Sequence, residues 1–172
     1  MSYDTASHIC PGPSASALST AVFTDSRFTK VVSPNGGIVM FGNLAFLART
    51  GKRHTIDIIR TTVDDSDGIT KPIPLLAVGA AAHVNAESSS FGNSRGFGML
   101  IYLGATANVS NCTLSNNHRS DVGAGGASVN LHASATFTGC TIQNNTAFIS
   151  GAGVYISVGL HDRSIGIRKR RR

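Results

Sequence analysis

The chain has 172 residues, 41% hydrophobic and 14% charged, with 19 glycines, no tryptophan and only 6% aromatic residues. This length fits one domain, and so many small residues suit narrow, tightly stacked layers better than a thick core. Five basic residues of the terminal run 168–172 account for most of the net charge of +6. No stripe of Arg and Lys interleaved with aromatic residues is present elsewhere, so no nucleic-acid partner is expected.

The first 20 residues predict an irregular segment. They contain Asp4, His8 and three residues with two prolines at 11–13, and they lack the basic start and apolar stretch of a signal peptide. No run reaches the roughly 18 apolar residues of a membrane span, so no transmembrane segment is expected. At the other end, residues 161–172 predict a disordered basic tail, with a polyanion-binding or localisation patch as the alternative.

A six-residue phrase recurs along the chain. Its copies begin at Phe23, Ile58, Ala86, Val109 and Phe137, at spacings of 35, 28, 23 and 28 residues. Self-similarity at such a period is typical of stacked structural units, each of which buries its apolar side chains against its neighbours.

The third position of the phrase predicts a tight bend. Positions one, four and six hold the residues expected to point inward, whereas a regular strand would turn positions one, three and five inward. The third position holds Asp25, Ser88, Asn111 and Gly139, residue types that tolerate or favour left-handed or turn dihedrals. Arg60 fits this slot poorly. The phrase therefore indicates two short strands that meet at a bend.

A glycine-led strand supplies a third side. Copies lie at 37–41, 98–103, 126–131 and 153–158, and residues 75–78 take this role in the second unit after an insertion loop at 64–74. Three strands per turn predict an all-β fold: a right-handed parallel β-helix over residues 21–160, with about five rungs of 23–35 residues. Two alternative folds fit less well. The sequence lacks the Leu-x-x-Leu-x-Leu pattern of a leucine-rich repeat, and a β-sandwich would not repeat the same residues in register.

Two sets of polar or small residues occupy equivalent positions in the last two copies. Asn116 and Asn117 match Asn144 and Asn145, and we expect them to stack as amide ladders along a corner, with two ordinary polar turns as the alternative. Cys112 and Cys140 also match. Their side chains would run parallel rather than converge, so we expect two buried small residues and no disulfide. Cys10 lies in the irregular start. Asn108, Asn111 and Asn144 fit the glycosylation sequon.

Two kinds of short motif are the most distinctive in the chain. The first is a glycine pair followed by an apolar or small residue, at Gly36–Gly37 and Gly125–Gly126. The second is Leu114-x-x-Asn117, matched by Ile142-x-x-Asn145. They resemble the GGA(I/L/V) and FxxN motifs of polymorphic outer membrane protein repeats, within the pectin-lyase-like class of right-handed β-helices. The resemblance implies a secreted or surface-displayed adhesion stalk. The barrel and signal peptide of such proteins are not visible here, which is expected of a fragment of a longer protein.

The outward positions of the glycine-led strand hold no carboxylate. β-Helix polysaccharide lyases and hydrolases need clustered acids for acid–base chemistry or calcium, so this face argues against an enzyme. It carries Phe41, Tyr102 and Tyr155, which could form an aromatic platform for sugar rings; the alternative is that they pack under a neighbouring segment.

The insertion loop is the exception to the lack of acids. Asp64, Asp65 and Asp67 precede Gly68 and could hold calcium, but the flanking residues of an EF-hand loop are missing, so an exposed acidic loop is expected. The six histidines are scattered, with no paired spacing and no acidic companion motif, and each is expected at the surface or in a turn.

These features together predict a non-enzymatic scaffold without a cofactor that contacts glycans or cell-surface components. A fragment of a polysaccharide lyase or hydrolase is the alternative function.

Overall fold

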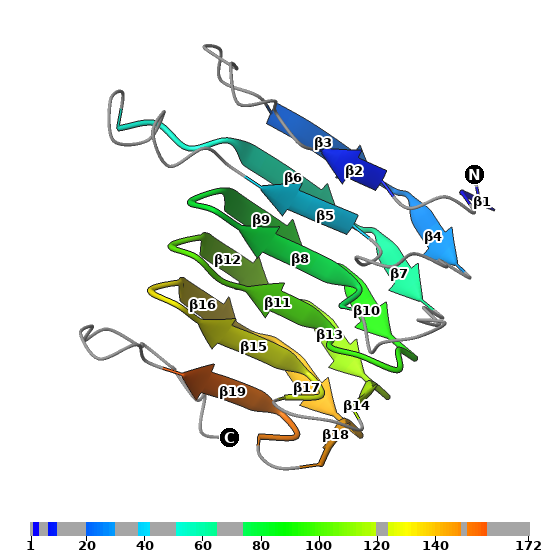
Figure 1. Cartoon of the computed structure of the whole chain (residues 1–172). Coiled ribbons are helices and arrows are strands. Elements are labelled where there is room, and N and C mark those ends of the chain that lie inside the picture. Colours follow the sequence, from blue (N-terminus) through cyan, green and yellow to red (C-terminus); the bar gives the residue numbers. More distant parts are fainter. Residues whose placement is uncertain are drawn as a thin grey trace.

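A computed structural model describes residues 20–29, 51–64, 74–119, 124–148 and 151–157, together with the backbone of three strands outside these ranges. The described residues form β-strands and no helix (Figure 1). The acidic residues Asp65 and Asp67, the terminal run 168–172 and Cys10 lie outside the described residues.

Three parallel sheets run the length of the molecule. Sheet A holds β1 (Ser2–Tyr3), β4 (Arg27–Thr29), β7 (Thr62–Asp64), β10 (Ser90–Gly92), β13 (Thr113–Ser115) and β17 (Thr141–Gln143). Sheet B holds β2 (Ser7–Ile9), β5 (Ile38–Phe41), β8 (Leu76–Gly79), β11 (Met99–Ile101), β15 (Ala127–Asn130) and β19 (Val154–Ser157). Sheet C holds β3 (Thr20–Thr24), β6 (Thr55–Ile59), β9 (His83–Glu87), β12 (Thr106–Ser110) and β16 (Ser134–Thr138). A short fourth sheet, D, pairs β14 (His118–Arg119) with β18 (Thr146–Ala147).

The chain passes through sheets C, A and B in turn and then begins the next rung, so consecutive rungs stack along one axis (Figure 1). Rung 1 contains β3, β4 and β5, and rung 5 contains β16 to β19. In sheet C, Phe23 pairs with Ile58, Ile58 with Ala86, Ala86 with Val109, and Val109 with Phe137. This register is the one given by the repeated phrase. The prediction of an all-β parallel solenoid is confirmed.

The bend expected at the third position of the phrase is present in all five rungs, between the strands of sheets C and A. The backbone there is left-handed, with φ of 50° at Asp25, 46° at Arg60, 50° at Ser88, 52° at Asn111 and 64° at Gly139. Left-handed dihedrals are costly for residues with a Cβ. The poor fit of Arg60 therefore did not prevent the bend from forming.

A second bend joins sheet B to sheet C and has no obvious sequence signal. Its two central residues both have positive φ, as in Leu103 and Gly104 (52° and 71°). The amide of Ala105 donates to the carbonyl of Tyr102 at 3.2 Å, which closes a type I′ turn. Equivalent pairs are Ala80–Ala81 and Leu131–His132. The Nη1 atom of Arg53 donates to the carbonyls of Ala81 (3.1 Å) and Gly104 (2.7 Å), so one guanidinium ties two of these turns together.

The core lies between the three sheets. Equivalent inward side chains of successive rungs stack on one another and form rows along the axis of the solenoid. Ile58, Phe91, Met99 and Leu114 are all 0% exposed. Full burial of a side chain of this size contributes about 1.5–3 kcal/mol. Because each inward side chain packs between rungs above and below it, the middle rungs bury their apolar residues best.

The segment 1–20, expected to be irregular, contains β1 and β2, which pair with β4 and β5 and extend sheets A and B beyond rung 1. Within the described residues there is no helix with the length and apolar character that crossing a membrane requires.

Candidate functional site: the outer face of sheet C

The aromatic residues expected to form a platform belong to different rungs: Phe41 ends β5, Tyr102 directly follows β11 and Tyr155 lies in β19. Phe41 pairs with Gly79 on the next strand, and Tyr155 pairs with Ser128. Tyr102 and Tyr155 are half-buried. Ala77 and Ser128 occupy outward positions of the same sheet, yet they are only 3% and 1% exposed. The outer face of sheet B is therefore covered at these two positions, and Phe41 and Tyr155 occupy different columns of the strand register.

Asp64 ends strand β7, where its Oδ1 atom accepts a hydrogen bond from Nδ2 of Asn93 at 2.7 Å. In the part of the chain that the structure describes, no three His, Cys, Asp or Glu side chains gather as they would around a metal ion. The described member of the acidic loop thus has a structural partner on the neighbouring rung.

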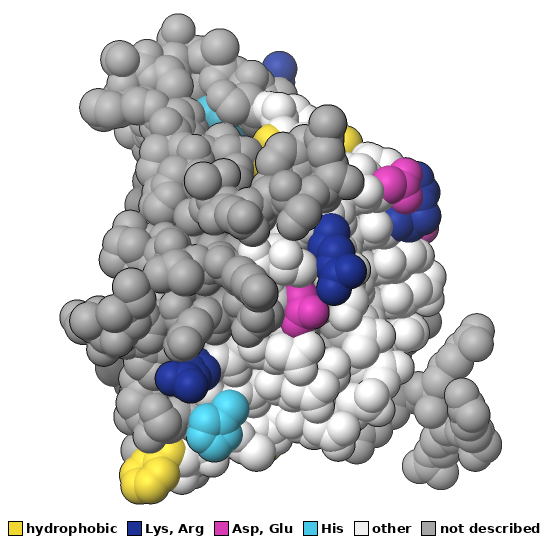
Figure 2. Space-filling model, turned by 90° about the vertical axis from the view of Figure 1, so that its right-hand side faces the viewer, with side chains coloured by type: hydrophobic (Ala, Val, Ile, Leu, Met, Phe, Trp, Pro, Cys, Tyr) yellow, Lys and Arg dark blue, Asp and Glu magenta, His cyan; other side chains and the backbone are white. Residues whose placement is uncertain are grey.

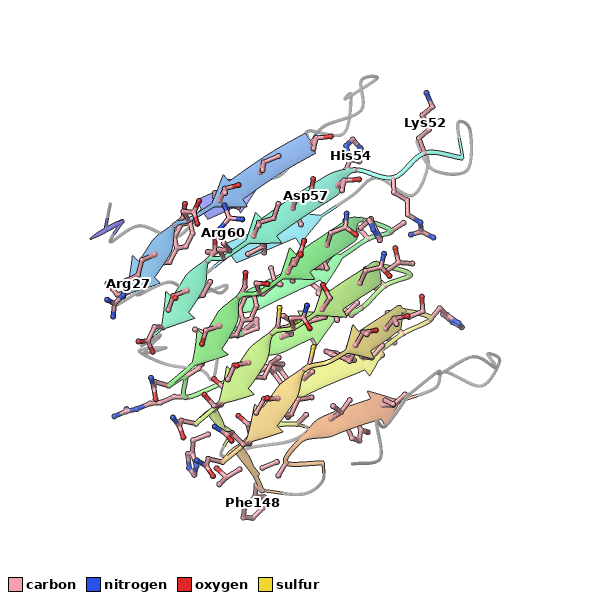
Figure 3. The ribbon with its side chains drawn as sticks, turned by 180° about the vertical axis from the view of Figure 1, so that it is seen from behind. Arg27, Lys52, His54, Asp57, Arg60 and Phe148 are labelled. Carbon is pink, nitrogen blue, oxygen red and sulfur yellow. The ribbon has the colours of Figure 1, made fainter. Side chains whose placement is uncertain are left out.

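The outer face of sheet C carries the densest polar network of the described residues. Figure 3 views the molecule from the side on which Asp57 is labelled, on the strand β6. Alternation along each strand turns every second residue outward. The outward residues of rungs 2 to 5 are Thr55, Asp57, Ile59, His83, Asn85, Glu87, Thr106, Asn108, Ser110, Ser134, Thr136 and Thr138. Nearly all of them are polar, and all are at least partly exposed.

Four of these side chains form a hydrogen-bonded relay across three strands. Nδ2 of Asn85 donates to Oδ1 of Asp57 at 2.8 Å. Oδ1 of Asn85 lies 2.8 Å from Nε2 of His83, and Nδ1 of His83 lies 2.7 Å from Oγ1 of Thr106. Asn108 on β12 also donates to Oδ1 of Asn85, at 3.3 Å.

The carboxylate of Asp57 fixes the direction of this relay. An ionised carboxylate only accepts hydrogen bonds, so the amide nitrogen of Asn85 must face it. The amide oxygen of Asn85 then faces His83, whose Nε2 must carry a hydrogen. In neutral His83 the Nδ1 atom is therefore an acceptor, and the hydroxyl of Thr106 donates to it.

The relay holds its side chains in fixed orientations on a flat surface. Neighbouring strands lie about 4.8 Å apart, so the face repeats polar groups at that interval along the stack. Asp57 and Glu87 are its two carboxylates, on adjacent strands β6 and β9. Most of the other outward residues are Thr, Ser and Asn, which can each donate and accept hydrogen bonds, so the face can contact a ligand rich in hydroxyl groups.

The corner that follows sheet A contains the expected asparagine ladder, in part. Asn117 is 0% exposed, and its Nδ2 donates to the carbonyl of Phe91 (3.2 Å) and to Oδ1 of Asn145 (3.0 Å). Nδ2 of Asn145 donates to the carbonyl of Leu114 at 2.9 Å. Asn116 and Asn144 are exposed and instead form left-handed bends, with φ of 56° and 52°.

Cys112 and Cys140 are free thiols in a column of hydroxyl and thiol side chains at the fourth position of the phrase. The column contains Ser26, Thr61, Ser89, Cys112 and Cys140. Each of these side chains donates a hydrogen bond to the backbone carbonyl two residues before it. Sγ of Cys112, for example, donates to the carbonyl of Ser110 at 3.2 Å. Burial raises the pKa of the Cys112 thiol from 9.0 to about 11, which keeps it protonated and unreactive at neutral pH. The column is structural.

The side of the molecule shown in Figure 2 has only scattered charged side chains on its described surface. The outward residues of sheet A in rungs 3 to 5 are Ser90, Gly92, Thr113, Ser115, Thr141 and Gln143. In these three rungs the outward positions of sheet A lack the histidine, asparagine and carboxylate groups found on sheet C, so they offer fewer kinds of contact; Asp64 of β7 is a carboxylate on sheet A in rung 2.

The chain is a parallel β-solenoid with a polar outer face on sheet C. Comparisons with protein-family models, with curated proteins and with solved structures found no match to it.

The relay residues were not among the sites predicted from the sequence. Asp57 and Asn85 immediately precede the first position of the repeated phrase and point outward by the same alternation that turns that position inward. The alternation along the strand before the bend places Asp57, Asn85 and Asn108 in one outward row.

Proposed function

We propose that this protein is a non-enzymatic scaffold that contacts glycans or similar hydroxyl-rich polymers through the outer face of sheet C. The relay of Asp57, Asn85, His83 and Thr106 carries the proposal. Its members are held in place by each other, so little side-chain freedom is lost when a ligand binds. A flat array also suits a long polymer, which gains affinity by repeating weak contacts along the stack.

A solenoid of this kind is proposed to wind as a right-handed parallel β-helix, because β-strand crossovers between parallel strands are right-handed in almost all proteins. The resemblance of the glycine pairs and Leu114-x-x-Asn117 to polymorphic outer membrane protein repeats supports a secreted or surface-displayed location.

The test is a glycan array followed by titration of any bound oligosaccharide with the purified chain. Asn108 and Thr136 are exposed on sheet C, so Asn108→Ala and Thr136→Ala should each weaken binding by about three- to tenfold, the effect of losing about one hydrogen bond. Thr141→Ala is the matched control, because Thr141 is exposed in the same rung as Thr136 but lies on sheet A. Equal losses in all three variants, or binding to no glycan, would contradict the proposal.

A polysaccharide lyase or hydrolase is the second candidate, and the pair of outward carboxylates on adjacent strands favours it. Asp57 and Glu87 would then act as acid and base. Turnover of polyuronates by the wild-type chain that is lost in Asp57→Asn or Glu87→Gln would establish this alternative. The triple change of Asp64, Asp65 and Asp67 to Asn tests whether the acidic loop contributes instead.

A further inference from the structure

His83 lies in the hydrogen-bonded relay on sheet C between one partner with a fixed role and one partner that can change its role. Its Nε2 atom lies 2.8 Å from Oδ1 of Asn85, and the bond from Asn85 to Asp57 keeps that amide oxygen facing the imidazole. Its Nδ1 atom lies 2.7 Å from Oγ1 of Thr106, a hydroxyl that can either donate or accept. The strands that pair with β9 on both sides, β6 and β12, are described.

Neutral His83 uses the hydrogen of the Thr106 hydroxyl. Because Nε2 carries the hydrogen that Asn85 accepts, Nδ1 is an acceptor and the hydroxyl of Thr106 donates to it. Thr106 is partly exposed, so a ligand in front of the sheet can reach it. In this state Thr106 offers that ligand only the lone pairs of its oxygen.

Protonated His83 reverses this bond. Both ring nitrogens then carry a hydrogen. The contact with Asn85 is unchanged, because an amide oxygen accepts in either state. At the other nitrogen, Nδ1 donates and Oγ1 of Thr106 accepts, which requires only rotation of the hydroxyl. The relay loses no hydrogen bond, and the hydroxyl hydrogen of Thr106 becomes available to a ligand.

Protonation also changes the charge of a face that otherwise carries only carboxylates. In the five described strands of sheet C, the acidic residues are Asp57 and Glu87, both outward, and there is no Lys or Arg. An anionic ligand is repelled by these two groups, and a positive charge on His83 offsets one of them. The titratable groups on the described residues that flank β6, β9 and β12 are Lys52, Arg53, His54, Arg60 and Cys112.

On the basis of the proposed function, we propose that the relay makes binding on sheet C pH-dependent, so that acidification strengthens the binding of glycans that carry carboxylate groups. A carboxylate accepts hydrogen bonds and never donates them, so it fits Thr106 only after the bond to His83 has reversed. Neutral glycans fit both states, because their hydroxyl groups donate as well as accept. Histidine is the side chain whose charge ordinarily changes within the physiological pH range.

The binding experiment titrates the full chain with an oligogalacturonate and with a neutral malto-oligosaccharide of the same length. Calorimetry is done at about pH 8 and about pH 5.5, on either side of the range in which histidine ordinarily titrates. The oligogalacturonate should bind about three- to fivefold more tightly at the lower pH, the effect of one exposed charge pair. The affinity for the neutral probe should change by less than about twofold, because it gains no such pair.

Four variants identify the groups responsible. His83→Gln should abolish the gain for oligogalacturonate, because glutamine is polar but does not titrate. Thr106→Ser keeps the hydroxyl and should retain the gain, whereas Thr106→Val should lose most of it. His118→Gln is the matched control and should retain the full gain: His118 is exposed and its Nδ1 contacts Oγ1 of Thr146, but it lies on sheet D. Circular dichroism of each variant verifies that the β-sheet is retained.

The direction of the relay is measured separately in the free protein. Nitrogen NMR shifts of the His83 imidazole distinguish its two neutral tautomers, and at about pH 8 we expect the hydrogen on Nε2. A hydrogen on Nδ1 would overturn the inference. So would an equal gain in wild type and His83→Gln, or an equal gain for the two probes. Binding of neither probe would overturn the inference alone if the glycan array reveals another ligand, and the proposed function as well if it reveals none.

Discussion

Arg60 and Asp25 occupy the same bend position in neighbouring rungs and form a two-pronged ion pair. Nε of Arg60 lies 2.6 Å from Oδ1 of Asp25, and Nη2 lies 2.7 Å from Oδ2. The hydrogen bonds from Arg60 lower the pKa of the Asp25 carboxyl below 3.8. Both residues also have left-handed dihedrals. A favourable side-chain contact thus accompanies an unfavourable backbone conformation at the same residue.

Replacing Arg60 separates these two effects. Arg60→Gly and Arg60→Ala both remove the ion pair, but only glycine relieves the left-handed backbone. We expect Arg60→Gly to have the higher Tm of the two in thermal unfolding followed by circular dichroism. Because the two side chains are 57% and 62% exposed, the pair itself contributes little, so Arg60→Gly should melt no lower than the wild type. An alanine variant as stable as the glycine variant would show that the bend imposes no strain.

Gly139 is the one glycine among the five bends, and its substitution should be costly. An added Cβ would lie 2.6 Å from Oδ1 of Asn111, and φ is 64°. The left-handed backbone alone costs about 1–2 kcal/mol for a residue with a Cβ. Gly139→Ala should therefore lower the free energy of unfolding in urea by at least about 1 kcal/mol.

The double variant Gly139→Ala with Asn111→Gly provides the control. Removing the Asn111 side chain removes the clash and leaves the backbone cost of alanine. The two changes should then be non-additive, since the residues touch. Additive effects would mean that the contact between these two positions is unimportant.

Removing the buried amide of Asn117 should destabilise the solenoid strongly. Asn117→Ala leaves the carbonyl of Phe91 and the amide of Ser94, which lies 3.3 Å from Oδ1 of Asn117, without this partner. Each buried polar group left unpaired costs about 1–3 kcal/mol, so we expect a loss of about 2–4 kcal/mol in urea unfolding. Asn108→Ala, on the exposed face, should change stability by less than about 0.5 kcal/mol. Similar losses in the two variants would contradict a ladder role for Asn117.

Cys112 should make stability fall at high pH. Burial raises the pKa of its thiol from 9.0 to about 11. The folded state then holds the proton more tightly than the unfolded state, so this contribution to stability is complete below about pH 9 and is lost as the pH rises toward about 11. The urea midpoint of the wild type should drop over this range more steeply than that of Cys112→Ala. Parallel curves would show that the thiol is not desolvated.

The architecture could be predicted from the sequence because equivalent positions of every rung have the same structural requirement, inward burial or a bend, and so hold similar residues. The column that begins at Phe23 holds an apolar residue in each of the five rungs, and the column that begins at Asp25 holds a residue with positive φ in each. A single residue that fits poorly, such as Arg60, therefore does not hide the pattern. Regular alternation then gives the inward rows of all three sheets.

The candidate site could be predicted only in part. The row of Asp57 and Asn85 follows from the 28-residue spacing of the repeated phrase. The hydrogen bonds that join this row to His83 depend on side-chain orientation, which the repeat does not specify. The type I′ turns were also missed, because Ala80, Ala81 and Leu131 have no local preference for positive φ. Stacking on the neighbouring turn, rather than the residue itself, imposes that conformation.

The connections between the sheets differ in how much their number of residues varies from rung to rung. Every strand of sheet C is joined to sheet A by two residues, as between Thr24 and Arg27 or between Thr138 and Thr141. The connection from sheet A to sheet B varies: β10 ends at Gly92 and β11 begins at Met99, whereas β7 ends at Asp64 and β8 begins at Leu76. Strand register is the same in both cases. Loops could therefore be exchanged or enlarged at this corner while the frame keeps its shape, which would let related chains diversify one surface without refolding the rest.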